Sequence, residues 1–217
     1  MKVINFAEQN SLVNQYMMEL RDENIQKDMM RFRTNIKRIG GIMAYEISKT
    51  LEYNEVDTTT CLGTARSRVL GETVVLATIL RAGLPLHQGM HDFFDHAENA
   101  FVSAYRKYVS DNDFRIHIEY IAAPRIDDKT LIICDPMLAT GSSMELAYEA
   151  LLTKGHPSKV HLVSVIASRQ AIDYIRNKFP EDTTLLVAAV DDAINGHKYI
   201  VPGLGDAGDL AYGEKAD

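Results

Sequence analysis

Apolar residues recur at helical spacing in the N-terminal third of the chain. Leu12, Tyr16 and Leu20 follow one another at intervals of four residues, and a second series recurs at intervals of three or four. Such spacing places apolar side chains on one face of a helix, so we predict that this third is helical. Gly40 and Gly41 lie inside the second series and predict a break or kink there. The second series consists of Met29, Phe32, Ile36, Ile39, Met43 and Ile47.

Basic residues fill many of the positions between these apolar ones. We interpret them as a solvated helix face, because acidic residues are interspersed among them. A basic nucleic-acid-binding helix is the alternative interpretation, which the acidic neighbours weaken. The basic residues are Arg21, Lys27, Arg31, Arg33, Lys37 and Arg38, and the acidic ones are Glu19, Asp22, Glu23 and Asp28.

Strand and helix patterns alternate along the rest of the chain. Residues 114–120 alternate between apolar and polar side chains, which predicts a half-exposed strand that is antiparallel or peripheral. Continuous apolar strands separated by helices imply a parallel sheet covered on both faces. For a helix at 144–154 we predict Ser142 or Ser143 as N-cap and Gly155 at C′. The other expected strands lie at 73–80, 101–105, 131–134, 160–167 and 184–190, with a further helix at 170–178.

These patterns predict a single α/β domain over residues 1–217, with a helical N-terminal part at 1–55 and an irregular C-terminal loop at 195–217. Hydrophobic residues make up 46% of the 217 residues, which excludes disorder as the main state. The net charge of −7 argues against broad binding to nucleic acid or anionic membranes, although it leaves room for a local cationic pocket.

Export and membrane signals are not recognisable in the sequence. The segment MKVINFAEQN lacks the apolar stretch of a secretory signal, and the longest strongly apolar run, 73–80, is far shorter than the roughly 20 residues of a membrane span. Cys61 and Cys134 are too few for a disulfide framework, and we interpret them as reduced thiols. We therefore expect a soluble, cytoplasmic protein.

Residues 131–143 form the most informative segment, because a buried strand ends in an acid and a tight loop leads into a helix. Ligands bind at the carboxyl ends of strands in open α/β sheets, and a helix N-terminus attracts anions. Gly141 lets the backbone approach a phosphate, and Asp135 accepts hydrogen bonds from sugar hydroxyls. The segment therefore indicates a phosphorylated sugar, with an ordinary strand-to-helix turn as the alternative; it is neither a Walker A loop nor a Rossmann fingerprint. Further hydroxyl donors are Thr140, Ser142 and Ser143.

Residues 199–209, called the Gly-rich loop below, read Tyr-Ile-Val-Pro-Gly-Leu-Gly-Asp-Ala-Gly-Asp. Glycine, proline and aspartate together are typical of an irregular, turn-rich segment. Such a loop can present backbone N–H and C=O groups to a flat polar ligand. A mobile tail is the alternative interpretation.

Residues 135–143 resemble the ribose-5-phosphate loop of phosphoribosyltransferases, which use phosphoribosyl pyrophosphate (PRPP). The sequence Asp-Pro-Met-Leu-Ala-Thr-Gly resembles the variant of this motif that is found in uracil phosphoribosyltransferases. Pro136 stands where most relatives carry a second acid, and Ser142 stands where many carry glycine, although its N–H and hydroxyl can still serve. The resemblance implies a type I phosphoribosyltransferase-like α/β fold: a parallel sheet flanked by helices, with a helical N-terminal part and a C-terminal base-binding loop or hood.

The Gly-rich loop is similar to the uracil-binding loop of the same family. The resemblance places uracil against the chain at Ile200, Gly205, Asp206 and Ala207, and brings Asp206 close to the diphosphate and its metal. Backbone N–H, C=O and N–H groups in turn match uracil, whereas cytosine would leave buried groups unpaired.

Two arginines are candidates for the diphosphate side of the site. Arg81 follows the strand at 73–80 and resembles the substrate-contacting arginine of the family's pyrophosphate loop, and Arg106 matches a second one. A surface charge is the alternative for a lone arginine, and for Arg66 and Arg68 the sequence leaves both a surface charge and a substrate contact open. The full set that the resemblance implies for PRPP is Arg81, Arg106, Asp135, Pro136, Met137, Leu138, Ala139, Thr140, Gly141, Ser142, Ser143 and Asp206.

The resemblance implies that uracil and PRPP react to give UMP and diphosphate, a step of pyrimidine salvage, with Arg81 and Asp206 as catalytic residues. It also implies that Mg²⁺ arrives with PRPP. The expected partners are these two small molecules, with no nucleic acid and no membrane, and the apolar N-terminal helices predict a homo-oligomer. The alternatives are an enzyme for another base and a non-catalytic regulator that senses PRPP or a nucleotide.

His87, His91 and Asp95 fall at intervals of four residues and form a candidate metal-binding face of a helix. No cysteine joins them, no HExxH motif is present, and Gly89 weakens the helix. We therefore favour a structural or surface role for these residues.

Overall fold

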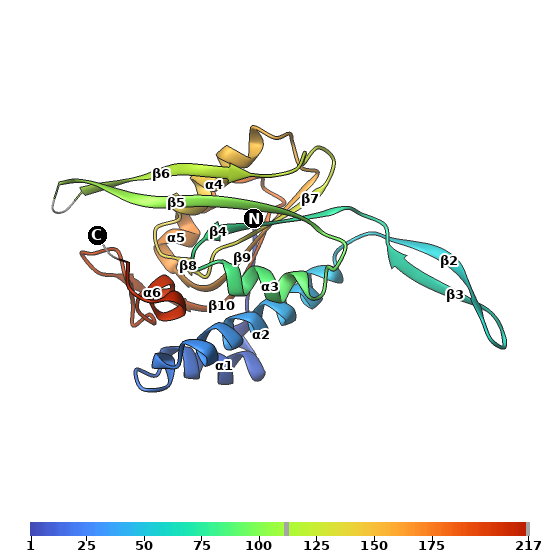
Figure 1. The fold of residues 1–217 in the computed structure, drawn as a ribbon, viewed down its shortest axis with the longest axis horizontal. Coiled ribbons are helices and arrows are strands. Elements are labelled where there is room, and N and C mark those ends of the chain that lie inside the picture. Colours follow the sequence, from blue (N-terminus) through green and yellow to red (C-terminus); the bar gives the residue numbers. More distant parts are fainter. Residues whose placement is uncertain (111–112, 216–217) are drawn as a thin grey trace.

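A sheet of mostly parallel strands forms the centre of the structure, a computed structural model that describes residues 1–110 and 113–215, and only the backbone of residues 104–110 and 113–118 (Figure 1). Its strands are β1 (Lys2–Asn5), β4 (Val74–Leu80), β5 (Glu98–Ser110), β6 (Asp113–Ala122), β7 (Thr130–Cys134), β8 (Met137–Leu138), β9 (Lys159–Ser168) and β10 (Thr184–Asp191). They lie in the order β1-β10-β9-β7-β4-β5-β6, with β8 beside β9. The β5–β6 pair is antiparallel and the other neighbours are parallel.

Helices cover both faces of this sheet, as Figure 1 shows. The helices are α1 (Leu12–Arg21), α2 (Met29–Ser48), α3 (Leu84–His91), α4 (Ser142–Leu152), α5 (Arg169–Ile175) and α6 (Ala207–Tyr212), with short 3-10 helices at Phe6–Glu8 and Ile25–Lys27. Helices α1, α2, α3 and α6 contribute to the apolar core on one face, and α4 and α5 to the core on the other. Within the described residues, no helix has the length and apolar character needed to cross a membrane.

Alternation along the strands explains why the sheet is buried on both sides. Successive side chains of a strand point to opposite faces, so Ile132 of β7 packs into the core beneath α1–α3 while Leu131 and Ile133 pack beneath α4 and α5. All five residues of β7 are buried. The predicted α/β fold with a parallel sheet covered on both faces is confirmed.

Apart from β5, the predicted strands are found with bounds close to those expected. Strand β6 is antiparallel and lies at the edge of the sheet, as the alternation at 114–120 predicts. Strand β5 is much longer than the expected 101–105, because it continues into a hairpin with β6. Helix α5 ends at Ile175, three residues before the expected end.

Two parts of the N-terminal third are strands that the sequence analysis missed. Strand β1 precedes the first helix and pairs with β10. Strands β2 (Tyr53–Thr60) and β3 (Gly63–Leu70) form an antiparallel hairpin that extends away from the rest of the molecule in Figure 1. Nearly every residue of this hairpin is exposed. The prediction that the whole first third is helical is therefore wrong, and the expected 1–55 helical part also contains β1 and the start of β2.

Helix α2 runs without interruption through Gly40 and Gly41, so the predicted break is wrong. These glycines serve close packing instead. A Cβ atom on Gly40 would lie 2.5 Å from the carbonyl oxygen of Leu86 in α3, and one on Gly89 would lie 2.0 Å from that of Lys37 in α2. Glycines on both helices therefore let α2 and α3 approach each other along their backbones.

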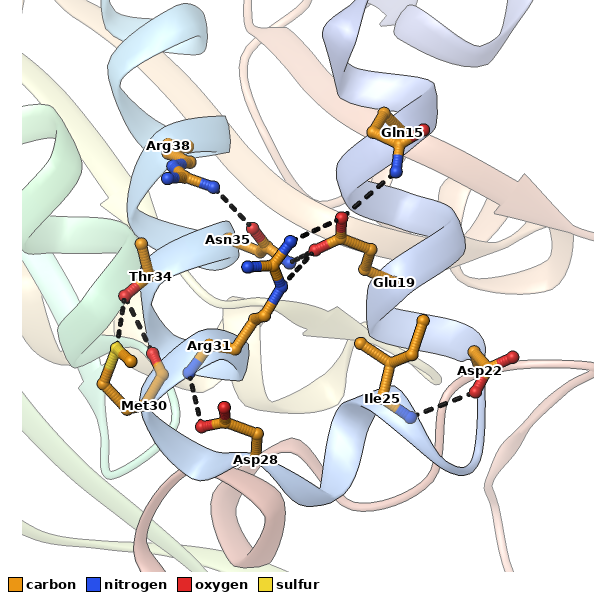
Figure 2. A network of polar contacts seen from close by, with 10 residues as sticks. All are labelled: Gln15, Glu19, Asp22, Ile25, Asp28, Met30, Arg31, Thr34, Asn35 and Arg38. Carbon is orange, nitrogen blue, oxygen red and sulfur yellow. Dashed lines mark hydrogen bonds and ion pairs between the residues drawn. The ribbon is translucent and has the colours of Figure 1, made fainter.

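A polar network around the buried residues Glu19 and Asn35 joins α1 to α2 (Figure 2). The Glu19 carboxylate accepts hydrogen bonds from Arg31 at 2.8 and 2.9 Å, from Asn35 at 2.7 Å and from Gln15 at 3.1 Å. These contacts, led by the Arg31 hydrogen bond, lower the pKa of Glu19 to about 2. Arg31 therefore takes part in an interhelical ion pair, while its side chain stays 49% exposed, in agreement with its interpretation as part of a solvated face.

Candidate active site

Asp135 follows the last residue of β7 and is largely buried. Its backbone N–H donates to the Val163 carbonyl at 3.1 Å, and its Oδ1 accepts from the Met137 N–H at 3.2 Å. The next carbonyl, that of Pro136, accepts from the N–H groups of Val165 and Ile166. The acid is thus held at the carboxyl end of a central strand, as the sequence predicts.

The loop that follows Asp135 is tied to β9 and α5 before it enters α4. Residues 137 and 138 form β8 beside Ile166 and Ala167, and the Ser168 hydroxyl donates to the Ala139 carbonyl at 2.7 Å. Thr140 Oγ1 accepts a hydrogen bond from the Ser142 N–H at 3.4 Å and lies 3.2 Å from the Ser142 hydroxyl. Two hydroxyl groups and the first turn of a helix therefore lie together after the buried acid.

The caps of α4 differ from those predicted. Gly141 is the N-cap, with φ +85°, and no side chain caps the helix; Ser142 and Ser143 are already helical. A Cβ on Gly141 would lie 2.8 Å from side-chain atoms of Tyr174 and Ile175, so this turn requires glycine. At the other end Thr153 is the C-cap, and Gly155 lies beyond C′. Gly141 has no side chain to cap the first turn of α4, and the Ser142 N–H makes only a long hydrogen bond of 3.4 Å to Thr140 Oγ1, so this helix end is suited to an anion.

The Gly-rich loop is pinned to the core at several points. Strand β12 (Ile200–Val201) pairs with β11 (Ala193–Ile194), and the side chains of Ile200, Leu204 and Ala207 are buried. Asp206 caps α6 by accepting from the N–H groups of Gly208 at 2.8 Å and Asp209 at 3.0 Å. Gly205 and Asp206 are exposed between these anchors. This packing disagrees with the alternative interpretation as a mobile tail.

Arg81 connects the Gly-rich loop with the sheet. It follows β4, and its guanidinium donates to Asp209 Oδ1 at 2.9 Å and to the Gly213 carbonyl at 3.3 Å. Two residues later, Gly83 lies so close to β7 that a Cβ there would be 2.9 Å from the Cys134 carbonyl oxygen. The turn after β4 therefore lies between the loop that follows Asp135 and the C-terminal segment.

The other candidate arginines are placed less centrally. Arg106 belongs to β5, and its side chain lies outside the described part of the structure. Arg66 and Arg68 lie on the exposed β3 strand, where Arg68 pairs with Glu55 at 3.4 Å. Their position agrees with the interpretation as surface charges.

His87 is buried against the sheet, next to His91 and Phe101, with ring centroids 6.2 and 5.5 Å away. Burial lowers its pKa. Asp95 lies beyond the end of α3, and its carboxylate is 3.8 Å from His96. In the residues that the structure describes, no group of three or more His, Cys, Asp or Glu side chains is arranged to hold a metal.

Three residues in or beside the Gly-rich loop were not among the candidate site residues of the sequence analysis: Arg21, Asp191 and Asp209. Arg21 was assigned to the solvated face of a helix, but it forms a bidentate ion pair with Asp191 at 2.7 and 2.8 Å. The available signal was that Asp191 is the last residue of a buried strand, and Asp135 directly follows one. At both positions, an acid at the carboxyl end of a parallel strand marks a candidate site residue.

Three features lie together at the carboxyl ends of the parallel strands. They are the loop that follows Asp135 and enters a helix, an arginine after the neighbouring strand, and a glycine-rich segment that packs beside that arginine. This arrangement, on a parallel sheet covered by helices, defines the class of phosphoribosyltransferases. Residues 7–214 match the family model of uracil phosphoribosyltransferase. The chain belongs to the uracil phosphoribosyltransferase family.

Relatives in other organisms cover almost the entire chain. A uracil phosphoribosyltransferase of Porphyromonas gingivalis is 61% identical over 99% of this chain and all of its own length. One from Methanothermobacter thermautotrophicus is 39% identical over 96% of this chain and 94% of its own. The structure of the AQ2163 protein of Aquifex aeolicus superposes with a TM-score of 0.86 at 30% identity, covering 97% of this chain and 98% of that one.

Proposed function

We propose that this protein is an enzyme that transfers the phosphoribosyl group of PRPP to uracil, giving UMP and diphosphate. The observation that carries the proposal is the contact of Arg81 with Asp209, because it joins the turn after β4 to the C-terminal segment beside the Asp135 loop. A sugar phosphate, a diphosphate and a base are adjacent groups of the two substrates. Sites for these three groups at the carboxyl ends of neighbouring strands would bring the two substrates together for the transfer.

The 5′-phosphate of PRPP is assigned to the start of α4. Backbone N–H groups there and the hydroxyls of Thr140, Ser142 and Ser143 can donate to its oxygens. The backbone from Pro136 to Ala139 leads into this turn and is assigned to the same substrate. Asp135 accepts hydrogen bonds from the ribose hydroxyls, since its carboxylate is held at the strand end by its own backbone contacts.

The diphosphate leaves as a polyanion, so positive charge must face it. Arg81, together with Arg106, supplies this charge from the protein, and a guanidinium can donate to two phosphate oxygens at once. Mg²⁺ bound to PRPP would neutralise further charge on the leaving group. Asp206 is exposed on the loop beside Arg81, and such a carboxylate suits the water shell of a hydrated Mg²⁺.

Uracil is assigned to the Gly-rich loop, against the backbone of Ile200, Gly205 and Ala207, with Asp206 at the reacting end. Backbone donors and acceptors cannot rotate as side chains do, so they distinguish uracil from cytosine. Bond breaking at the anomeric carbon develops positive charge on the ribose. The protein therefore acts by holding base and sugar in line and by stabilising the departing diphosphate.

The test is UMP formation from uracil and PRPP with Mg²⁺, with cytosine, orotate and hypoxanthine run in parallel. We expect turnover with uracil alone, and Asp206→Ala should lower kcat by roughly 100-fold, the cost of losing one group that acts on developing charge. Asp192→Ala is the matched control, because this exposed aspartate pairs with Arg169 at the surface. Binding of PRPP without turnover of any base would favour a non-catalytic sensor.

We also propose that the protein self-associates into a homo-oligomer. The N-terminal helices bury much of their apolar faces within the chain but leave Leu12, Met29 and Met30 exposed. Further support comes from the β2–β3 hairpin, which exposes Val56, Leu62 and Val69. Apolar residues on a projecting arm are suited to contact with another chain. Light scattering should give a multiple of 24.3 kDa, and the double variant Val56→Asp, Leu62→Asp should shift the mass toward one chain. A wild-type mass of one chain would contradict the proposal.

A further inference from the structure

Arg21, Asp191 and Gly203 form a closed set of contacts behind the Gly-rich loop. Arg21 is the last residue of α1, and Asp191 is the last residue of β10. The Arg21 guanidinium donates to both oxygens of Asp191, at 2.7 and 2.8 Å, and its Nη1 also donates to the Gly203 carbonyl at 2.9 Å. The Gly203 N–H donates to Asp191 Oδ2 at 2.8 Å. Both backbone polar groups of Gly203 are therefore held, and we call this set the Arg21–Asp191 clamp.

The clamp acts on a turn that has little freedom elsewhere. Gly203 has φ +65°, and a Cβ there would lie 2.1 Å from the Ile200 carbonyl oxygen. Its neighbours Ile200 and Leu204 are buried in the core. The exposed residues Gly205 and Asp206 follow directly, and Ala207 is buried again. The exposed backbone that is assigned to the base therefore lies between two segments that are fixed to the core. The clamp fixes one of these segments.

Electrostatics favour a permanent clamp. Burial acts to raise the pKa of Asp191, but hydrogen bonds from Arg21 and from the Gly203 N–H outweigh it and hold the pKa below its ordinary value. The carboxylate is therefore charged at neutral pH. Charge-assisted, bidentate hydrogen bonds of this kind are stronger and more directional than neutral ones.

The clamp also connects the loop to the N-terminal helices. Glu19 lies two residues before Arg21 on α1, and α2 holds it through Arg31 and Asn35 (Figure 2). The position of Arg21 is therefore set by the packing of α1 on α2. A change in that packing would be passed to the Gly203 turn through one side chain.

We propose that Arg21 and Asp191 are positioning residues that set the affinity and selectivity of the Gly-rich loop for its pyrimidine base. The inference rests on the proposed function and extends it to two residues that touch neither substrate in that assignment. Recognition through backbone groups requires that the backbone be held to within a fraction of an ångström. Loosening the Gly203 turn should weaken binding of the base and leave the PRPP loop after β7 intact.

The test compares steady-state constants of Asp191→Asn, Arg21→Ala and Arg21→Lys. Asp191→Asn should raise the KM for uracil by roughly 10- to 100-fold, the cost of disrupting charged hydrogen bonds, and reduce the preference for uracil over cytosine. The KM for PRPP should stay within about twofold, since that substrate has its own loop. Arg21→Lys should recover part of the uracil affinity lost in Arg21→Ala, because lysine keeps the charge but not the two-pronged geometry.

Asp192→Asn is the matched control, as the adjacent residue forms an exposed ion pair with Arg169. Hydrogen exchange over residues 200–207 gives a readout without turnover, and should be faster in Asp191→Asn than in Asp192→Asn. An unchanged KM for uracil, or equal rises in KM for both substrates, would overturn the inference, as would unchanged exchange. The wild-type protein could be inactive with uracil while hydrogen exchange is still faster in Asp191→Asn than in Asp192→Asn. That result would contradict the proposed function and not the positioning of the loop by the clamp.

Discussion

Replacing Arg81 by alanine is expected to lower kcat/KM for PRPP by roughly 1,000-fold, since preorganised charge on the leaving group is among the largest single contributions to catalysis. Arg81 follows the central strand β4 and reaches Asp209 and the Gly213 carbonyl across the proposed site. Its loss would remove positive charge from the diphosphate and release the C-terminal segment together. Both kcat and the KM for PRPP should therefore change.

Steady-state kinetics at saturating uracil measure this effect. Arg81→Lys should fall between wild type and Arg81→Ala, because lysine supplies a point charge without the planar fork. Arg169→Ala is a matched control, since Arg169 also pairs with an aspartate at 2.9 Å but on the exposed surface. If the constants for Arg81→Ala equal those of this control, the assignment of Arg81 to the diphosphate is wrong.

Gly89→Ala is expected to lower the free energy of unfolding by about 3 kcal/mol or more, the range that overpacking of a core reaches. A Cβ at this position would lie 2.0 Å from the Lys37 carbonyl oxygen and 3.1 Å from the Gly40 Cα. Both neighbours are backbone atoms of α2, so they cannot rotate away as a side chain can. The two helices would have to separate.

Urea unfolding gives the measurement, and two other glycines grade the expectation. Gly196→Ala should change stability by less than about 0.5 kcal/mol, as a surface substitution does, because a Cβ there has nothing within 4 Å. Gly41→Ala should be intermediate, since its Cβ would meet the ring of Phe93, a partly exposed side chain that can move. Equal stability of the Gly89 and Gly196 variants would contradict the packing argument.

Local patterns in the sequence predicted the parts of the fold that bury side chains regularly. The strands at 131–134, 160–167 and 184–190 are continuous apolar runs, and they are central in the sheet. The hairpin at 53–70 escaped notice because both of its faces are exposed, so no alternation of apolar and polar residues marks it. Strand β1 has four residues and pairs with a strand about 180 positions later. Glycines in α2 suggested a break because their packing partner in α3 is not visible locally.

The candidate site likewise has parts that the sequence predicts and parts that it does not. Asp135 with its loop and the Gly-rich loop are contiguous motifs, so the chain order alone displays them. The Arg21–Asp191 pair joins residues 170 positions apart, and neither residue has a neighbour that reveals its partner. Contacts of this kind depend on the finished arrangement of α1 beside β10. They become apparent only when the three-dimensional structure is known.

The distance along the chain between Arg21 and Gly203 has a consequence for biosynthesis. These residues are separated by 182 positions, and β1 likewise cannot pair until β10 has been synthesised. At ribosomal rates of about 5 to 20 residues per second, roughly 10 to 40 s pass between the synthesis of the N-terminal segment and that of its partners. During that interval the apolar face of α1 lacks part of the core that covers it. The Gly203 turn and the Gly-rich loop around it should therefore be the last part of the molecule to form.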